Sequence, residues 1–248
     1  MIKTKRIIPT LLIEDGLLYK TVKFKSPNYV GDPINAIKIF NDKEVDELVV
    51  LDITADRKKT GPNFELLSEI ASECFMPLAY GGGVSTIEHF ERLFEIGIEK
   101  VSVNELFFSN RELLKDVINR YGAQSLVITL DVIKPFFGDY KVSNTKDSLI
   151  KVLHDIDTLG VGELMINTVD REGTFKGFDL ELLQKVINEV SVPTIMCGGA
   201  SSMNDFKAAF DAGASAVAAG SFFVYVGKHK AVLITYPSQV EINQIFEK

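Results

Sequence analysis

The 248-residue sequence has no tryptophan, two cysteines and three histidines, and these low counts exclude several kinds of site. Cys74 and Cys197 form no CxxC motif, so the sequence predicts neither a disulfide framework nor a zinc site. It contains no HExxH, GxSxG or P-loop motif and no His/Cys cluster with the spacing of metal ligands. We therefore expect no metal and no cofactor.

Positive charge and long apolar runs are also scarce. The 27 basic residues are outnumbered by 34 acidic ones, which gives a formal net charge of −7. Sequence-independent binding to nucleic acid requires a basic surface that displaces counterions, so we expect no such partner. The apolar run near the start is short and is followed by Glu14 and Asp15, which predicts neither a signal peptide nor a membrane span. A cytoplasmic protein with no membrane partner is expected.

Short runs rich in Val, Ile and Leu alternate with amphipathic segments along the whole chain. Most of these runs show no alternation of polar and apolar residues, which is typical of parallel strands covered by helices on both faces. The expected strands are Arg6–Ile13, Glu47–Ile53, Pro77–Tyr80, Lys100–Val103, Leu126–Asp131, Glu163–Thr168, Pro193–Cys197 and Ala216–Ala219. Eight strand–helix units predict an α/β fold, a (βα)₈ TIM barrel. No linker interrupts them, so we predict a single barrel domain over residues 1–248.

Several of the predicted helices end in glycine. Helical patterns begin at Asn63 and at Thr86, and glycines follow the helical patterns at Gly97, Gly122, Gly160 and Gly213. Glycine adopts the left-handed conformation that commonly terminates a helix. We expect left-handed caps at these four positions.

An internal repeat relates the two halves of the chain. A shift of 116 residues places Pro77 on Pro193, Gly82-Gly83 on Gly198-Gly199 and Phe90 on Phe206. A repeat of half the chain predicts two similar half-barrels, because solenoid repeats are only about 20–50 residues long. A slightly longer shift aligns Thr10-Leu11-Leu12 with Thr129-Leu130-Asp131.

The active site of such a barrel lies at the carboxyl ends of its strands. Polar residues expected there are Asp52, Asn104, Asp131, Asn167, Asp170 and Ser221. Asp131 closes an apolar run, so its carboxylate should project into the barrel mouth and could act as a general acid or base. The alternative is a carboxylate that caps the following helix or that is satisfied by hydrogen bonds in the first turn after the strand.

Glycines follow three of the expected strands, in Gly81-Gly82-Gly83, Gly198-Gly199 and Gly220-Ser221. Glycine allows backbone N–H groups to approach an anion, and the loops after strands seven and eight form the usual phosphate site of these barrels. Tight turn geometry alone is the alternative explanation. Two opposite anion sites would suit an elongated substrate with a phosphate at each end.

Four charged residues of alternating sign stand at the strand starts, at the other end of the barrel: Arg6, Glu47, Lys100 and Glu163. They could form a ring of ion pairs that stabilises the barrel bottom. They could also gate a passage along the barrel axis, because paired charges can separate when a partner docks.

The sequence resembles the cyclase subunit of imidazole glycerol phosphate synthase (HisF) over most of its length. The matching stretches are Arg6-Ile-Ile-Pro9, Asp15-Gly16, Gly31-Asp32-Pro33, residues 46–54, Gly81-Gly-Gly83, Lys100-Val-Ser-Val-Asn104, Asp170-Arg-Glu-Gly-Thr174 and Cys197-Gly-Gly199. In that family the barrel receives ammonia through its core from a docked glutaminase, and the ammonia cleaves and cyclises a bis-phosphorylated ribonucleotide.

The resemblance implies a role for each matching residue. Arg6, Glu47, Lys100 and Glu163 match the ammonia gate. Asp131 matches one catalytic aspartate, and Lys20 matches a lysine of the substrate loop. Gly199 and Ser221, with Gly173 alongside, match one phosphate site, and we also expect Asp52, Gly83, Asn104, Asn167 and Gly220 to bind substrate or phosphate.

The departures from the family pattern gather at the catalytic face. The second catalytic aspartate is replaced by Leu12, which cannot transfer a proton. Glu105 follows Asn104 where the family has a hydroxyl residue, and its carboxylate should repel a phosphate. Asn167 and Cys197 replace hydroxyl residues, and the segment Gly227–Pro237 lengthens the loop after the eighth strand.

These matches and departures suggest a HisF-like subunit diverged from the histidine pathway. It would take ammonia from a glutaminase at the barrel bottom and serve the amidation of a surface-polysaccharide sugar, with a sugar-amidating ligase as a further partner and a phosphorylated or anionic small molecule as substrate. One alternative is an authentic cyclase in which Asp131 suffices. The other is a non-catalytic scaffold that activates the glutaminase.

Overall fold

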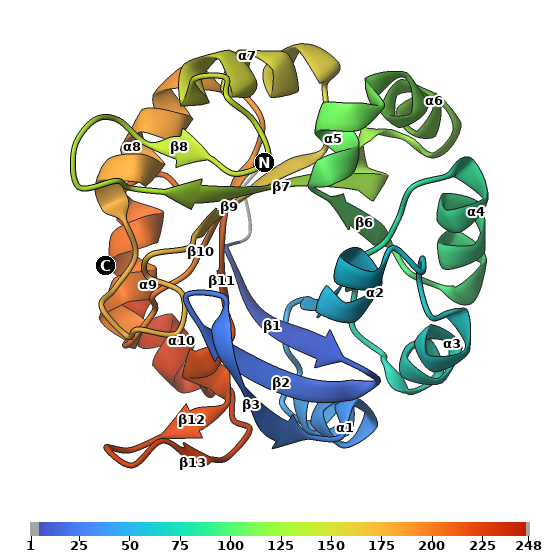
Figure 1. Cartoon of the computed structure of the whole chain (residues 1–248). Coiled ribbons are helices and arrows are strands. Elements are labelled where there is room, and N and C mark those ends of the chain that lie inside the picture. The colour runs from blue at the N-terminus through green and yellow to red at the C-terminus, as the bar shows by residue number, and fades with distance from the viewer. Residues whose placement is uncertain (1–4, 247–248) are drawn as a thin grey trace.

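The computed structural model describes residues 5–246 and contains a closed barrel of parallel strands surrounded by helices (Figure 1). The barrel strands are β1 (Arg6–Glu14), β4 (Leu48–Asp52), β5 (Leu78–Gly81), β6 (Lys100–Val103), β7 (Leu126–Ile133), β9 (Glu163–Thr168), β10 (Thr194–Cys197) and β11 (Ala216–Ala219). Each pairs in parallel with the next, and β11 pairs with β1 to close the barrel. The predicted (βα)₈ barrel is confirmed.

The eight expected strands all form, and none of their bounds differs from the prediction by more than two residues. The agreement has a simple cause: a strand covered on both faces is apolar throughout, so its ends coincide with the ends of the apolar run. The predicted single domain also includes residues 1–4 and 247–248, which lie outside the described part of the chain.

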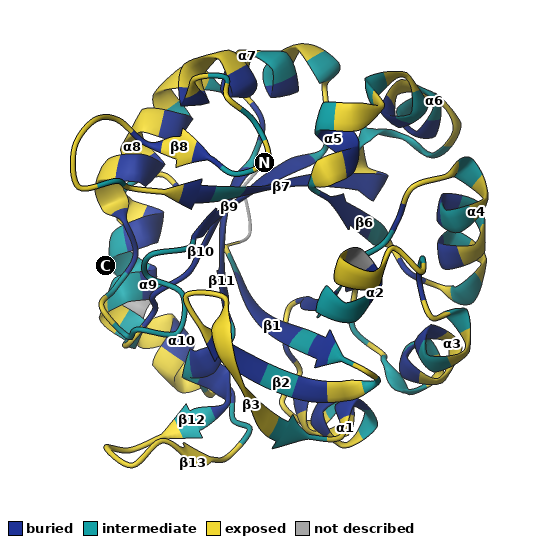
Figure 2. Ribbon diagram, viewed as in Figure 1, coloured by how far each residue is buried: buried dark blue, intermediate teal, exposed yellow. Residues whose placement is uncertain are grey.

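The longer helices cover the outside of the barrel and bury the faces that they turn toward the strands (Figure 2). They are α1 (Pro33–Asp42), α3 (Phe64–Glu73), α4 (Ile87–Ile96), α6 (Arg111–Tyr121), α7 (Leu149–Leu159), α8 (Leu180–Glu189), α9 (Met203–Asp211) and α10 (Gln239–Phe246). Two short helices, α2 (Ile53–Lys58) and α5 (Glu105–Ser109), directly follow β4 and β6 and lie at the mouth of the barrel (Figure 1). The side chains of Asn63 and Thr86 accept hydrogen bonds from backbone N–H groups three residues later, which fixes the starts of α3 and α4.

Glycine terminates two of these helices in the predicted way. Gly97 and Gly160 are left-handed caps of α4 and α7. Gly213, with a φ of +104°, lies one residue beyond the cap of α9. The prediction is wrong for Gly122, whose ψ of 153° is extended, because a 3₁₀ turn (η1, Ala123–Ser125) follows it directly.

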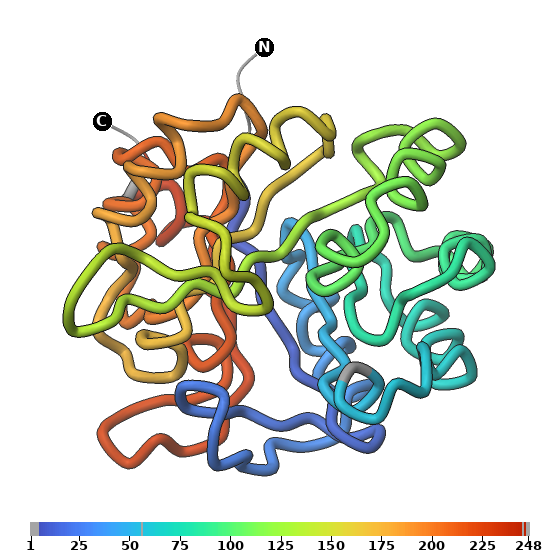
Figure 3. Tube along the Cα trace, turned by 45° about the horizontal axis from the view of Figure 1, so that its top comes forward, coloured from blue at the N-terminus to red at the C-terminus, as the bar shows by residue number. Residues whose placement is uncertain are grey.

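Two hairpins and a short strand pair extend beyond the carboxyl ends of the barrel strands (Figure 3). One hairpin is β2 (Leu17–Val22) with β3 (Lys25–Gly31), and the other is β12 (Tyr225–Val226) with β13 (Ala231–Val232). A third excursion pairs β8 (Lys141–Val142) with the end of β7. The sequence analysis placed Lys20 in a loop, but it lies on β2, because β1 continues directly into this antiparallel hairpin.

The interior of the barrel is apolar at mid-height. A cluster separate from the larger core between strands and helices contains Ile8, Val49, Ala79, Val127, Met165, Ile195, Cys197, Ala216 and Ala218. This layer separates the two ends of the barrel, so each end can be described by itself. Within residues 5–246, no helix combines the length and apolar character needed to cross a bilayer.

Candidate functional site

A cavity of about 720 Å³ opens at the carboxyl ends of the barrel strands, a size suited to a small molecule. All eight barrel strands contribute to it, through Thr10, Leu12, Leu51, Asp52, Gly81, Ser102, Val103, Thr129, Asp131, Met165, Asn167, Cys197 and Ala219. Every substrate-binding residue predicted from the sequence also lines it: Lys20, Asp52, Gly83, Asn104, Asn167, Gly173, Gly199, Gly220 and Ser221. The structure thus brings these predicted residues together.

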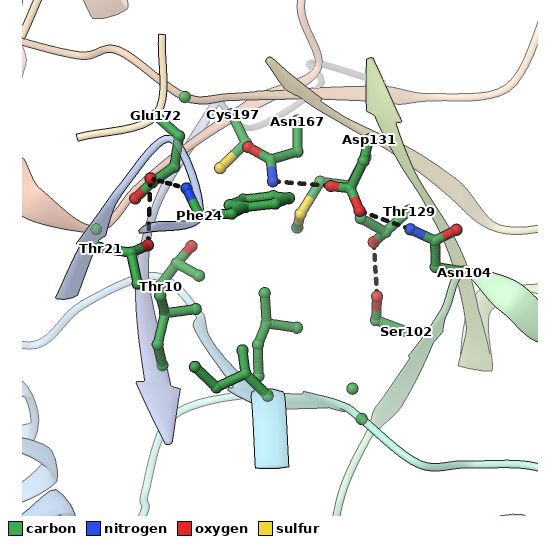
Figure 4. A pocket seen from close by; sticks show the side chains of 18 of the residues that line it. Thr10, Thr21, Phe24, Ser102, Asn104, Thr129, Asp131, Asn167, Glu172 and Cys197 are labelled. Carbon is green, nitrogen blue, oxygen red and sulfur yellow. Dashed lines mark hydrogen bonds between the residues drawn. The ribbon is translucent and has the colours of Figure 1, made fainter. Parts of the chain in front are cut away.

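Asp131 lies at the centre of the polar side of this cavity (Figure 4). The side-chain amide of Asn104 donates to its Oδ2 atom at 2.8 Å, and that of Asn167 donates to its Oδ1 atom at 3.0 Å. The next helix, α7, begins at Leu149 and is capped by Ser148, so Asp131 is not a helix cap. The two amide donors do satisfy its carboxylate, as the other form of the alternative expects. Two amide donors fix the carboxylate in the barrel mouth, as a positioned acid, base or hydrogen-bond acceptor requires.

Further polar atoms line the cavity on both sides. The hydroxyl groups of Ser102 and Thr129 are hydrogen-bonded to each other at 2.6 Å. Among the described residues, the buried Oγ1 of Thr10 and Oδ1 of Asn167 have no hydrogen-bond partner. Leaving buried polar atoms unpaired is costly, so a bound ligand or solvent that paired with them would be stabilised.

The opposite side of the cavity is apolar. Leu12 and Leu51 are register partners on β1 and β4, and Ile53 and Val84 line the cavity beside them. Leu12 therefore faces the same cavity as Asp131, as the half-barrel alignment predicts, but it brings no ionisable group. Asp52 is near this side, and its Oδ1 accepts from the backbone N–H groups of Thr54 and Ala55, which caps α2.

At the other end of the barrel, the four charged residues form a closed ring of ion pairs. Arg6 pairs with both Glu47 and Glu163, and the Lys100 Nζ lies 2.9 Å from a carboxylate oxygen of each. Glu47 is 2% exposed and Glu163 is 8% exposed, so the carboxylates are almost fully desolvated. Burial tends to lower the pKa of Arg6, but its two glutamate partners raise it overall. The ring closes the bottom of the apolar layer.

Comparison with known proteins agrees with this architecture. The family described as "Histidine biosynthesis protein" matches residues 6–230. A Pseudomonas aeruginosa protein named provisionally as imidazole glycerol phosphate synthase subunit hisF2 is 49% identical, over 97% of this chain and 98% of its own length. A Vibrio vulnificus protein named provisionally as subunit hisF3 is 44% identical over 98% and 96%, and imidazole glycerol phosphate synthase subunit HisF of Streptomyces coelicolor is 35% identical over 92% and 95%.

The chain belongs to the HisF family of histidine biosynthesis proteins. It is a diverged member. Its cavity is lined by the carboxylate of Asp131 from one half-barrel and by the apolar side chain of Leu12 from the other.

In this HisF-family barrel, Lys20 reaches the cavity from β2. It is 3% exposed, and its Nζ donates to the carbonyl oxygen of Thr10. Burial lowers the pKa of Lys20 to about 8, although the nearby carboxylate of Glu172 acts in the opposite direction. A Cβ atom at Gly220 would come within 2.4 Å of the Lys20 Nζ, so glycine makes room for this ammonium group beside Ser221. The group adds positive charge to the expected anion site after β10 and β11.

Glu172 is a cavity residue that the sequence analysis did not single out. Its carboxylate accepts from the Thr21 hydroxyl and from the backbone N–H of Phe24, both at 3.2 Å. Its carbonyl oxygen accepts from the Lys23 N–H at 3.0 Å, so three bonds hold the β2–β3 hairpin to the loop after β9. Burial raises the pKa of Glu172. Its position within Asp170–Thr174, a stretch that resembles the HisF family, could have identified it as a candidate.

Phe24, also missed, extends its ring from the tip of the β2–β3 hairpin into the middle of the cavity (Figure 4). Its backbone has a φ of +61°, an uncommon conformation for a phenylalanine, and the hydrogen bond to Glu172 supports it. Cys197 lies on the same side of the cavity, and burial raises the pKa of its thiol to about 12. The thiol is therefore protonated at neutral pH and is a poor nucleophile.

The second expected anion site contains an unexpected ion pair. Glu105, which should repel a phosphate, pairs with the side chain of Lys59. Gly83 and Asn104 line the same part of the cavity. The pairing offsets the charge of Glu105, so the repulsion expected from the sequence is weaker than a lone carboxylate would give.

Metal ligands are not assembled around this cavity. No group of three or more His, Cys, Asp or Glu side chains within the described residues could hold a metal ion.

Proposed function

We propose that this chain is the ammonia-using subunit of a glutamine amidotransferase complex, diverged from imidazole glycerol phosphate formation toward amidation of a surface-polysaccharide sugar. One observation carries the proposal: the four-residue ring at the barrel bottom is complete, while the cavity has Leu12 facing Asp131. The bottom of the barrel, where ammonia is expected to enter, keeps the four charged residues that resemble the HisF gate. The cavity, where ammonia would be used, has Leu12 in place of an acidic residue.

The ring suits a gate that a docked glutaminase opens. Arg6 and Lys100 each bridge Glu47 and Glu163, so moving one cation away would break two ion pairs and open the axis. Beyond the ring lies the apolar layer of Ile8, Val49 and their neighbours. Neutral ammonia can cross such a layer at much lower cost than ammonium, because a buried, unpaired charge is heavily penalised. This sequence of environments supports delivery of ammonia from the bottom to the cavity.

At the cavity, Asp131 would act as the remaining acid/base group or as the group that positions the ammonia acceptor. Gly173, Gly199, Gly220 and Ser221, with Lys20 beside them, would hold one phosphate of the substrate. Asp52, Gly83, Asn104 and Asn167 would contact the other end of the molecule. A second carboxylate is missing because Leu12 occupies its place, so proton transfer from two opposite sides is not available.

The level of identity to the HisF of Streptomyces coelicolor, 35%, leaves room for divergence from the histidine pathway, and the hisF2 protein of Pseudomonas aeruginosa and the hisF3 protein of Vibrio vulnificus are more similar to this chain, at 49% and 44%. We propose a sugar-amidating ligase as the enzyme that consumes the ammonia. Both cysteines are free, which is compatible with a reducing cytoplasm as the place of action.

The missing carboxylate also favours a second candidate, a non-catalytic scaffold that only docks and activates the glutaminase. Such a scaffold would be indifferent to Asp131→Asn but damaged by Glu47→Ala. The proposed ammonia-using subunit would be damaged by both.

Reconstitution with a glutaminase tests the proposal. We expect the chain to raise the glutaminase rate, and we expect the purified pair to leave the bis-phosphorylated ribonucleotide unconverted. Leu12→Asp should restore ribonucleotide turnover only in a true cyclase. Here we expect the variant to stay far below a HisF with both aspartates, because Glu105, Asn167 and Cys197 also depart from the family pattern. Vigorous turnover of the ribonucleotide by the unmodified chain would refute the divergence, and an unchanged glutaminase rate would refute the amidotransferase role.

A further inference from the structure

We propose that the β2–β3 and β12–β13 hairpins form a docking surface for an acidic partner protein that covers the mouth of the cavity. The proposal rests on the proposed function in one respect: the partner would be the protein that consumes the ammonia. The exposure and the charge of the two hairpins support the surface independently of that function.

The two hairpins lie side by side at the carboxyl end of the barrel, because they follow the neighbouring strands β1 and β11 (Figures 1 and 3). Residues 22–29 and 226–233 are exposed without interruption. The exposed side chains include Tyr29 at 58%, Val232 at 49% and Leu233 at 58%. An apolar surface shared by two protruding hairpins is a common mark of a protein interaction site.

Exposed apolar side chains gather on this end of the molecule. Phe136 is 93% exposed and Phe137 is 83% exposed, in the loop that joins β7 to β8 across the mouth from the hairpins. Including these two, ten of the fifteen large apolar residues that are exposed within residues 5–246 lie in the two hairpins, directly beside them, or between the end of β7 and β8: Leu17, Val22, Phe24, Tyr29, Ile133, Phe136, Phe137, Val226, Val232 and Leu233. A partner seated on both sides would cover the cavity mouth between them.

The charge of the hairpins selects an acidic partner. Residues 16–31 and 222–239 hold five of the chain's 27 basic residues and none of its 34 acidic residues. Lys23, Lys25, Lys228 and Lys230 are exposed, and only Lys20 of the five is buried. In a chain with a net charge of −7, two adjacent hairpins without a carboxylate form a local basic region. Such a region attracts and orients an acidic surface.

The rest of the rim favours a protein over a lipid surface or another uniform polyanion. Asp139 and Glu181 lie among lysines on the β7–β8 side, in pairs with Lys185 and Lys134. A uniformly anionic surface laid over the mouth would meet these carboxylates as well as the lysines. A protein can present acidic groups to the hairpins and a different pattern to the opposite side.

Covering the mouth would serve ammonia transfer directly. Ammonia that reaches the cavity through the barrel escapes to solvent unless the mouth is closed. Phe24 closes part of it, and a docked partner would close the remainder and place its own active site next to Asp131.

Site-specific photocrosslinking in the native cells tests the surface. Benzoyl-phenylalanine at Val232 and at Phe136 should crosslink to one and the same protein, whereas a control probe at Ile150, which is 57% exposed on α7, should not. The crosslinked protein is then identified by mass spectrometry and purified. Its affinity for the chain should fall with rising salt, and Lys228→Glu with Lys230→Glu should weaken it about tenfold or more. The matched control, Lys38→Glu with Lys115→Glu on the exposed faces of α1 and α6, should change it less than twofold.

Three outcomes would overturn the proposal: no common protein at the two probes, crosslinks only to lipid, or crosslinks only to a second copy of the chain. Stimulation of the glutaminase is measured in parallel, because it reports on the opposite end of the barrel. A chain that stimulates the glutaminase but gives no common crosslink refutes the docking surface alone. Loss of stimulation refutes the proposed function whatever the crosslinks show.

Discussion

The two ends of the barrel differ in how their charges are arranged. At the bottom, two cations and two carboxylates at the starts of four different strands neutralise each other in a closed ring. At the mouth, Asp131 is held by two neutral amides, and the residue facing it across the cavity is Leu12. The charges at the bottom all pair with one another. At the mouth, the two positions related by the half-barrel repeat hold a carboxylate at Asp131 and an apolar side chain at Leu12. Symmetry in the chain therefore does not guarantee symmetry in the chemistry.

The largest effect is expected from opening the ring at its most buried member. Glu47→Ala leaves Arg6 and Lys100 each with one partner fewer, and breaking a buried ion pair costs about 3–5 kcal/mol. Urea denaturation should show a loss of this size. Glu73→Ala, which removes a solvent-exposed ion pair with Lys38, is the matched control and should cost less than about 1 kcal/mol. Similar losses in the two variants would show that the ring is not a buried structural unit.

At the mouth, Asp131→Asn should lower the rate at which ammonia nitrogen is incorporated into the acceptor by about 100-fold or more, because a positioned acid or base contributes about 10²–10⁴-fold to a rate. The measurement is nitrogen incorporation into the acceptor, with glutamine and with ammonium chloride as alternative sources. A defect at the mouth should lower both rates equally and leave glutaminase stimulation within about twofold of normal. A loss confined to glutamine would assign Asp131 to ammonia transfer instead.

The lowered pKa of Lys20 predicts how stability and anion binding change with pH. Between about pH 8 and 10.5 the unfolded chain holds a proton on Lys20 that the folded chain has released, so the free energy of unfolding should rise with pH across this window. Relative to Lys20→Met, the gain is at most about 3 kcal/mol. Binding of inorganic phosphate should weaken over the same window, because the ammonium charge is lost. The free energy of unfolding is measured by denaturation, and phosphate binding by calorimetry, for the unmodified chain and for Lys20→Met at each pH. If the two proteins change with pH in the same way, the assignment to Lys20 is wrong.

The smallest effect is expected at the Lys59–Glu105 pair. Both side chains are at least half exposed, so Lys59→Met should change the free energy of unfolding by less than about 1 kcal/mol. It should nevertheless weaken binding of an anion near Gly83 and Asn104 severalfold, because the carboxylate of Glu105 is no longer paired. The double change Lys59→Met with Glu105→Gln should restore binding, and a failure to do so would show that Lys59 itself binds the anion.

Much of the barrel could be predicted because each strand is marked by a short apolar run in its own part of the sequence. Apolar runs mark the strands, and their fixed order around a barrel brings Arg6, Glu47, Lys100 and Glu163 to one end and Asp131 to the other. The hairpins could not be predicted in this way. Residues 22–29 are exposed and mix lysines with apolar residues, so no apolar run marks them as a strand. The conformation of the hairpin depends on hydrogen bonds to Glu172, which lies about 150 residues later in the chain.

The sequence predicted which residues line the cavity, but not which of them form hydrogen bonds or ion pairs with one another. Strand ends identified Asn104 and Asn167 as cavity residues, yet only the packed barrel shows both amides bonded to Asp131. The neutralisation of Glu105 by Lys59 likewise joins two loops that no sequence spacing relates. Side chains that meet across a barrel mouth are set by tertiary geometry, and that geometry also explains why Phe24 and Glu172 were missed.

The account is tested most directly by supplying ammonium chloride and the bis-phosphorylated ribonucleotide to the purified chain, without a glutaminase, and measuring cyclisation. Ammonium chloride bypasses the ring, so the rate reports on the mouth alone. With Leu12 in place of one acid/base group, we predict a rate at least about 100-fold below that of a HisF with both aspartates, measured side by side. A comparable rate would contradict the central claim that the mouth of this barrel has left the reaction of its family.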